Sequence, residues 1–115
     1  CGRALIIAYS HCISHGINMA KGLQQQKAWV DSGRVLLYRY NPDLTRQGKN
    51  PLIVEGKGPK GDLRDVLLSE NRFKLLAKTN KEGFEKLLGE AQKDVWHRWN
   101  LYQSIAGMGA DKPAE

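Results

Sequence analysis

The hydrophobic pattern begins with a short continuous apolar run from Ala4 to Ala8. Such a run is typical of a strand buried on both faces of a parallel sheet. Further runs rich in β-forming residues predict strands over 35–40 and 52–55. A buried strand needs neighbours, and only three residues precede this one, so we expect missing upstream sequence to complete the sheet. In this chain alone, the side chains of residues 5–7 should be incompletely covered.

The stretch after this strand predicts a helix from about Gly16 to Val30, because its apolar positions form a loose stripe at helical spacing. Ser14 can cap the start of this helix. The three glutamines at 24–26 should face solvent. Gly33 is placed to end the helix, since glycine enters the left-handed conformation at little cost.

Helical patterns dominate the remainder of the chain. Asp62 should cap a short helix, and a second helical segment should surround Phe73 and Leu76. Thr79 and Glu82 stand three apart, the spacing of a capping box, and should open one long amphipathic helix. The apolar positions of that helix are Phe84, Leu87, Leu88, Ala91, Val95, Trp99, Tyr102 and Ile105.

These elements predict an α/β fold, in which part of a mainly parallel sheet has flanking helices and a helical C-terminal extension. We expect residues 1–61 to hold the strands, the loop around Cys12 and the first helix. Residues 62–106 should form the helical extension, and residues 107–115 a disordered tail.

The formal net charge of +6 raises the expectation of an acidic partner, a membrane surface or nucleic acid. Acidic and basic residues are interleaved from position 55 onward, however, which favours an ordinary solvated surface. No apolar stretch approaches the roughly 18 residues that a membrane span needs. The two cysteines are too few for a disulfide framework. We therefore expect a cytoplasmic protein.

Cys12 is the candidate site residue, because it lies just beyond the carboxyl end of the first predicted strand. Ligands of open α/β sheets gather at this edge, and thiolates are the natural ligands of iron–sulfur clusters. The alternative is a small buried free cysteine. His11 and His15 allow a Cys–His nucleophile pair or a two-His metal site. Neighbouring residues of an extended chain point to opposite sides, which places His11 poorly for activating Cys12.

Two further patterns have both a functional and a structural interpretation. The glycine-rich loop from Gly56 to Gly61 can cradle phosphate, but Pro59 removes an amide and the phosphate-loop pattern is absent, which favours a surface loop. An aromatic set can stack on single-stranded nucleic acid or belong to the core. Its members are Trp29, Tyr38, Tyr40, Trp96, Trp99 and Tyr102.

Two long segments carry a family resemblance. Residues 5–33 (LIIAYSHCISHGINMAKGLQQQKAWVDSG) and 38–51 (YRYNPDLTRQGKNP) resemble the end of the thiamine-diphosphate-binding domain of pyruvate:ferredoxin (flavodoxin) oxidoreductases. The segments ENRFKLLAKTN at 70–80 and RWNLY at 98–102 are similar to the same family. The chain departs from the family at Gly2-Arg3-Ala4, where Gly-Pro-Ser is usual, and Cys1 matches no family cysteine.

The resemblance implies a function in the oxidative decarboxylation of pyruvate with coenzyme A, in which [4Fe–4S] clusters pass electrons to ferredoxin or flavodoxin. It implies that Cys12 is the last of four ligands to the cluster nearest thiamine diphosphate. In the family the other three ligands, the diphosphate–magnesium motif and the pyruvate-binding residues lie far upstream. We therefore expect a C-terminal fragment that is inactive alone and depends on the upstream remainder of its polypeptide.

Two other classes of protein remain open. A small basic nucleic-acid-binding protein would show strongly salt-dependent binding of DNA or RNA. A stand-alone subunit that docks on separate redox subunits would begin with its own start codon.

Overall fold

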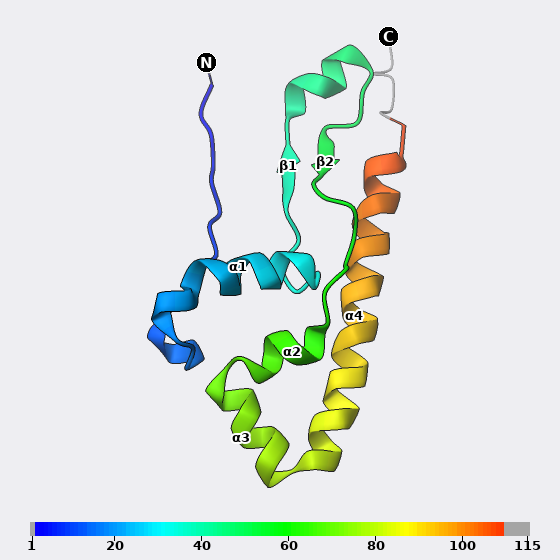
Figure 1. Cartoon of the computed structure of the whole chain (residues 1–115). Coiled ribbons are helices and arrows are strands. Elements are labelled where there is room, and N and C mark those ends of the chain that lie inside the picture. The colour runs from blue at the N-terminus through cyan, green and yellow to red at the C-terminus, as the bar shows by residue number, and fades with distance from the viewer. Residues whose placement is uncertain (1, 110–115) are drawn as a thin grey trace.

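A computed structural model describes residues 2–109 as an elongated molecule with extents of 62 × 30 × 19 Å. Figure 1 shows the long helix α4 along one side, with the strand pair beside its C-terminal half and two shorter helices beside its N-terminal half. The elements are α1 (Gly22–Asp31), β1 (Tyr38–Tyr40), β2 (Leu52–Val54), α2 (Leu63–Leu68), α3 (Asn71–Thr79), α4 (Lys81–Gly107) and 3₁₀ helices at Ile13–His15, Met19–Lys21 and Pro42–Gln47.

The sheet differs from the mainly parallel one expected. Strands β1 and β2 pair antiparallel, with Tyr38 opposite Val54 and Tyr40 opposite Leu52, and no other sheet occurs within residues 2–109. The reason lies in the connection, because a parallel pair needs a crossover of about a dozen residues or more, usually helical. Here the chain reverses through the short 3₁₀ helix Pro42–Gln47, and the second strand returns beside the first.

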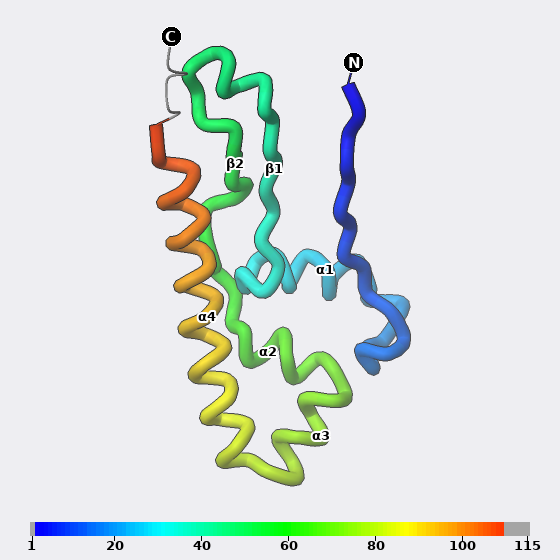
Figure 2. The backbone as a smooth tube through the Cα atoms, turned by 180° about the vertical axis from the view of Figure 1, so that it is seen from behind, coloured from blue at the N-terminus to red at the C-terminus, as the bar shows by residue number. Residues whose placement is uncertain are grey.

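The run from Ala4 to Ala8 is not paired in the described part of the chain, contrary to the predicted buried strand. Figures 1 and 2 show this N-terminal segment standing apart from β1. Leu5, Ile6 and Ile7 are 86%, 87% and 82% exposed. The expectation that these side chains would lack cover in this chain alone is confirmed, because the segment pairs with neither described strand.

Helix α1 begins later than predicted, at Gly22, and Ser14 lies in the preceding 3₁₀ helix instead of capping it. Gln25 was expected to face solvent but is buried, whereas Leu23 is exposed. Trp29 explains this orientation, because it is the most deeply buried side chain of α1 and Gln25 lies four residues earlier on the same face.

Gly33 ends α1 as predicted, with a left-handed φ of 74°. A Cβ at this position would lie 2.6 Å from the Pro59 ring and 2.7 Å from the Val95 side chain. Arg98 of α4 donates to the Gly33 and Arg34 carbonyls at 3.1 and 3.0 Å. The C-terminal end of α1 is therefore held in place by contacts with α4 and with the 56–61 loop.

The helical part follows the predicted pattern closely. Asp62 caps α2 by accepting a hydrogen bond from the Arg64 amide at 2.8 Å. The predicted Thr79–Glu82 capping box is wrong, because Asn80 caps α4 by accepting from the Gly83 amide at 2.9 Å. The Thr79 hydroxyl instead donates to a carbonyl of α3, the helix that it ends.

One apolar cluster joins α2 to α4. We call it the Leu63 cluster; its buried members are Leu63, Leu67 and Val95, with Phe73, Leu88 and Ala91 packed against them. Helix α4 continues to Gly107, and residues 110–115 of the expected disordered tail lie outside the described residues. None of the described helices is long and apolar enough to cross a membrane.

Candidate functional site

Cys12 opens a tight turn at the end of the extended N-terminal segment. The His15 amide donates to the Cys12 carbonyl oxygen at 3.1 Å. In the opposite direction, the Cys12 amide donates to His15 Nδ1 at 3.1 Å. Gly16 then turns the chain with a left-handed φ of 66°. Two hydrogen bonds in opposite directions thus join the first and last residues of the turn 12–15.

The thiol of Cys12 is free and exposed in this chain, not buried as the alternative would have it. Hydrogen bonds from the Ser14 side chain and then from the Ser14 backbone are the main causes that lower the pKa of the Cys12 thiol. The positive charge of Arg72 lowers this pKa further, as a smaller contribution. These surroundings favour the thiolate, which is the form that binds soft metal centres.

His15 is buried, with 8% of its surface exposed, although Cys12 beside it is exposed. Its Nε2 lies 3.0 Å from the Tyr9 hydroxyl. Its ring centroid lies 5.1 Å from that of Trp29, and Tyr9 lies 5.2 Å from Trp29. The three rings form one aromatic group beneath the turn.

Trp29 connects this aromatic group to a buried carboxylate. Its indole Nε1 donates to Glu70 Oε1 at 3.2 Å, and the Arg34 guanidinium donates to the same oxygen. Arg72 Nε donates to Glu70 Oε2 at 3.0 Å. Glu70 is 0% exposed, and its charge is compensated by two guanidiniums, as a buried charge requires. We call Glu70, Trp29, Arg34 and Arg72 the Glu70 cluster.

The far end of the turn is fixed to helix α3. The Asn71 amide donates to the Gly16 carbonyl oxygen at 3.1 Å. A Cβ at Gly16 would lie 2.8 Å from Asn71 Cβ, so the two backbones approach more closely than another residue would permit. The turn that carries Cys12 therefore rests on α1 through Trp29 and on α3 through Asn71.

His11 and His15 do not form a two-His metal site. Both ring nitrogens of His15 are engaged, by Cys12 and by Tyr9. His11 lies elsewhere, over the start of α1, where a Cβ at Gly22 would come within 2.1 Å of its Nε2. Within residues 2–109, no three His, Cys, Asp or Glu side chains converge as they would around a metal ion.

The other candidate patterns have structural roles. In the glycine-rich loop, a Cβ at Gly58 would lie 3.3 Å from the Trp99 indole, so the loop packs against α4. Tyr38 packs on Tyr102 with ring centroids 5.3 Å apart, and Trp29 is buried. The aromatic residues are therefore divided among separate contacts and do not form one stacking surface.

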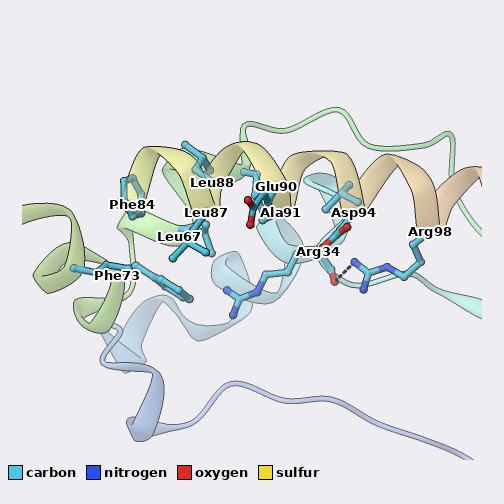
Figure 3. A pocket seen from close by; sticks show the side chains of 13 residues that line it. Arg34, Leu67, Phe73, Phe84, Leu87, Leu88, Glu90, Ala91, Asp94 and Arg98 are labelled. Atoms are coloured by element: carbon cyan, nitrogen blue, oxygen red, sulfur yellow. Dashed lines mark hydrogen bonds between the residues drawn. The ribbon is translucent and has the colours of Figure 1, made fainter. Parts of the chain in front are cut away.

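A hollow of about 600 Å³ lies between α2, α3 and α4, and Figure 3 shows Arg34 and Phe73 facing the α4 side chains across it. Its lining is mostly apolar, with charged side chains at the rim, and comprises Arg34, Leu63, Leu67, Phe73, Leu76, Phe84, Leu87, Leu88, Glu90, Ala91, Asp94, Val95 and Arg98. It is separate from the Cys12 turn, since neither the turn nor its aromatic group contributes to the lining.

Sequence reasoning identified Cys12 but missed the residues that hold it. Glu70 follows a short helix in a polar stretch, and nothing in its spacing distinguishes it from an exposed glutamate. Trp29 enters the sequence analysis only through the aromatic set, and Tyr9 carries no signal of its own beyond its place after the first apolar run. A signal could have come from the sequence Glu70-Asn71-Arg72, in which a basic residue lies close to a carboxylate that needs a partner.

The chain is similar to a segment of known enzymes. No family model matches the chain. Its curated relatives are enzymes named as oxidoreductases, and the chain spans about 9% of the length of the first of them. The chain is therefore homologous to one segment of large oxidoreductases.

The particular relatives are pyruvate oxidoreductases. The chain is 58% identical over 105 residues, 91% of its length, to the pyruvate-flavodoxin oxidoreductase of Trichormus variabilis. It is 43% identical, over the same share and 9% of the relative, to the pyruvate:ferredoxin oxidoreductase of Moorella thermoacetica. A pyruvate dehydrogenase [NADP(+)] of Euglena gracilis is 36% identical over 90% of the chain and 6% of the relative. The resemblance expected from the sequence is confirmed.

Proposed function

We propose that the chain is a segment of a 2-oxoacid oxidoreductase of the pyruvate:ferredoxin or flavodoxin type, and that Cys12 supplies one ligand to a [4Fe–4S] cluster. The observation that carries the proposal is the 58% identity to a pyruvate-flavodoxin oxidoreductase across 91% of the chain. The turn supports it, because Cys12 is an exposed free cysteine in surroundings that lower its pKa.

The donor set of the chain fits a partial cluster site. A [4Fe–4S] cluster takes about four cysteine thiolates, and the described residues provide one free cysteine, Cys12. The other three ligands would come from elsewhere in the parent polypeptide. When bound, the cluster would carry single electrons. The residues of this chain would hold one thiolate, and the Ser14 hydrogen bonds, which lower the pKa of the Cys12 thiol, would favour this form.

The resemblance supports a wider assignment for the parent enzyme. We propose that residues 1–61 end a thiamine-diphosphate-binding domain and that residues 62–106 form a helical extension of it. In the cytoplasm, the parent would bind thiamine diphosphate with magnesium and convert pyruvate and coenzyme A, with ferredoxin or flavodoxin accepting the electrons. The exposed segment at Leu5, Ile6 and Ile7 would join the mainly parallel sheet of that domain.

The decisive experiment replaces Cys12 in the full-length oxidoreductase. We expect Cys12→Ser to lose one cluster, because serine oxygen is a poor substitute for a thiolate. Iron content and the EPR signal of the reduced enzyme measure the loss. Cys1→Ser is the matched control and should keep both. Full iron occupancy and unchanged electron transfer in Cys12→Ser would contradict the ligand assignment.

A second experiment tests the dependence on the parent. Apolar burial is worth roughly 25 cal/mol per Å², and the uncovered segment at residues 5–7 offers such surface to any partner. We expect the 115-residue chain to self-associate in sedimentation, and its melting temperature to rise with concentration. The Ile6→Lys variant should reduce both effects, whereas Lys57→Ala should not. A monodisperse monomer with a concentration-independent melt would instead favour a stand-alone docking subunit.

A further inference from the structure

The hydrogen bonds of His15 define how its ring is protonated. Nδ1 accepts a hydrogen bond from the Cys12 amide nitrogen, 3.1 Å away. The ring proton of the neutral imidazole is therefore on Nε2, which donates a hydrogen bond to the Tyr9 hydroxyl oxygen, 3.0 Å away. Nδ1 also lies 3.3 Å from the Cys12 carbonyl oxygen. A nitrogen that accepts the amide proton cannot donate to that carbonyl, and the amide contact is the shorter of the two. The neutral ring therefore has one orientation in this turn.

The surroundings of the ring prevent other orientations. His15 is 8% exposed and contacts Trp29 at a centroid distance of 5.1 Å and an interplanar angle of 49°. Trp29 is held in turn by its hydrogen bond to the buried carboxylate of Glu70. A continuous set of contacts thus leads from the buried Glu70 cluster through Trp29 and His15 to the backbone of an exposed cysteine.

We propose that His15 is a positioning residue for Cys12, because its imidazole, fixed by Tyr9 and Trp29, orients the Cys12 amide and directs the exposed sulfur before any ligand binds. The inference rests on the proposed role of Cys12 as a cluster ligand. Mutation of a partner that orients a metal ligand typically costs about 10–100-fold in metal affinity or activity. The Cys12 backbone is extended, with φ −148° and ψ 171°, and its amide hydrogen bond to His15 holds the extended segment against the turn.

The first test uses the chain without any cluster and measures hydrogen exchange of the Cys12 amide by NMR. His15→Asn keeps an acceptor near the Nδ1 position, whereas His15→Phe keeps a buried ring without an acceptor. We expect exchange about tenfold faster in His15→Phe and close to wild type in His15→Asn, because only the former loses the amide hydrogen bond. Tyr9→Phe, which removes only the hydroxyl, should accelerate exchange less than His15→Phe. An amide that stays protected in His15→Phe would overturn the proposal.

The second test places the same variants in the full-length oxidoreductase. We expect His15→Phe to retain its iron but to change the EPR line shape and to shift the midpoint potential to a more negative value. His15→Asn should rescue both signals. Unchanged line shape and potential in His15→Phe would overturn the proposal. It would also be overturned if His15→Phe and His15→Asn shifted the potential equally and the shift only tracked a lower melting temperature.

Failure of this inference and failure of the proposed function are distinguishable. If Cys12→Ser retains all its iron, the ligand assignment fails, whatever the amide exchange shows. If Cys12→Ser loses a cluster but His15→Phe leaves both the amide and the EPR signal unchanged, the ligand assignment stands and the positioning role of His15 is overturned.

Discussion

Phe73 lies between two buried regions of opposite chemistry. On one side it packs against the Leu63 cluster, in which all members are apolar. On the other side the guanidiniums of Arg34 and Arg72 lie 5.7 and 5.0 Å from its ring centroid, within the Glu70 cluster. The apolar cluster joins helices that periodicity predicts, whereas the polar cluster joins residues from distant parts of the chain and supports the Cys12 turn. The first region therefore joins the helices to one another, and the second joins them to the Cys12 turn.

The apolar and the polar cluster should tolerate different substitutions. An apolar cluster loses contacts in proportion to the atoms removed. A polar cluster around a buried carboxylate is less tolerant, because removing one partner leaves the others unpaired at low dielectric. Substitutions at Glu70 and Leu63 separate these two behaviours, and a third at Glu85 gives the scale of a surface ion pair.

Glu70→Gln should have the largest effect. It removes the negative charge that compensates Arg34, whose side chain is 20% exposed, and we expect a loss of about 3 kcal/mol in the free energy of unfolding. Urea denaturation measures it. Glu90→Gln, at an exposed position of α4, is the control and should change stability by less than about 0.5 kcal/mol. A loss below about 1 kcal/mol in Glu70→Gln would mean that water compensates the guanidiniums.

Leu63→Ala should come next. Leu63 is 2% exposed in the apolar cluster, and truncation of a buried leucine costs about 2–5 kcal/mol, depending on how far the site can collapse. We expect a loss of about 2 kcal/mol here. Leu75→Ala, at a position 63% exposed, is the matched control and should be nearly neutral. We expect Leu63→Ala to leave the Cys12 amide protected, whereas Glu70→Gln should expose it. Equal exposure in both variants would remove the distinction between the two regions.

The Arg64–Glu85 ion pair at the surface should have the smallest effect. The hydrogen bond from Arg64 lowers the pKa of the Glu85 carboxyl. A lowered folded-state pKa gives stability that is fully present above the unfolded value, about 4.3, and is lost as the pH falls through the folded value. Glu85→Gln should therefore be slightly less stable than wild type at pH 7, and the difference should vanish once the pH falls below the folded-state pKa of Glu85. A stability difference that persists at low pH would exclude the ion pair as its source.

The helical part of the fold was predictable because each of its signals is local. The helix that holds Phe84 to Ile105 and the Asp62 cap both appear where periodicity and capping chemistry place them, although Leu87 and Ile105 of the predicted stripe are exposed. The sheet was not predictable in the same way, because parallel or antiparallel pairing depends on the path of the connection after Tyr40, not on the strand residues themselves.

The candidate site also has a part that local sequence predicts and a part that it does not. Cys12 stood out through its position after an apolar run, which is a local feature of the sequence. The contact between Trp29 and Glu70 joins residues 41 positions apart. A short stretch of sequence does not contain both residues, so it cannot reveal that they meet. The burial of Gln25 has the same origin, because the Ser69 hydroxyl that donates to its side-chain oxygen is 44 positions away.

The closed turn at Cys12 also has a consequence for conformational entropy. Ordering the backbone of one residue costs roughly 1–2 kcal/mol. Residues 12–15 are already ordered by the backbone hydrogen bond from His15 to Cys12, by the hydrogen bond from the Cys12 amide to the His15 side chain, and by the contact of that ring with Tyr9. This ordering takes place when the chain folds, so a metal centre that binds the Cys12 sulfur would not have to order the loop as well. Cys12 is in this respect a ligand on a preordered backbone, although its side chain is exposed to solvent.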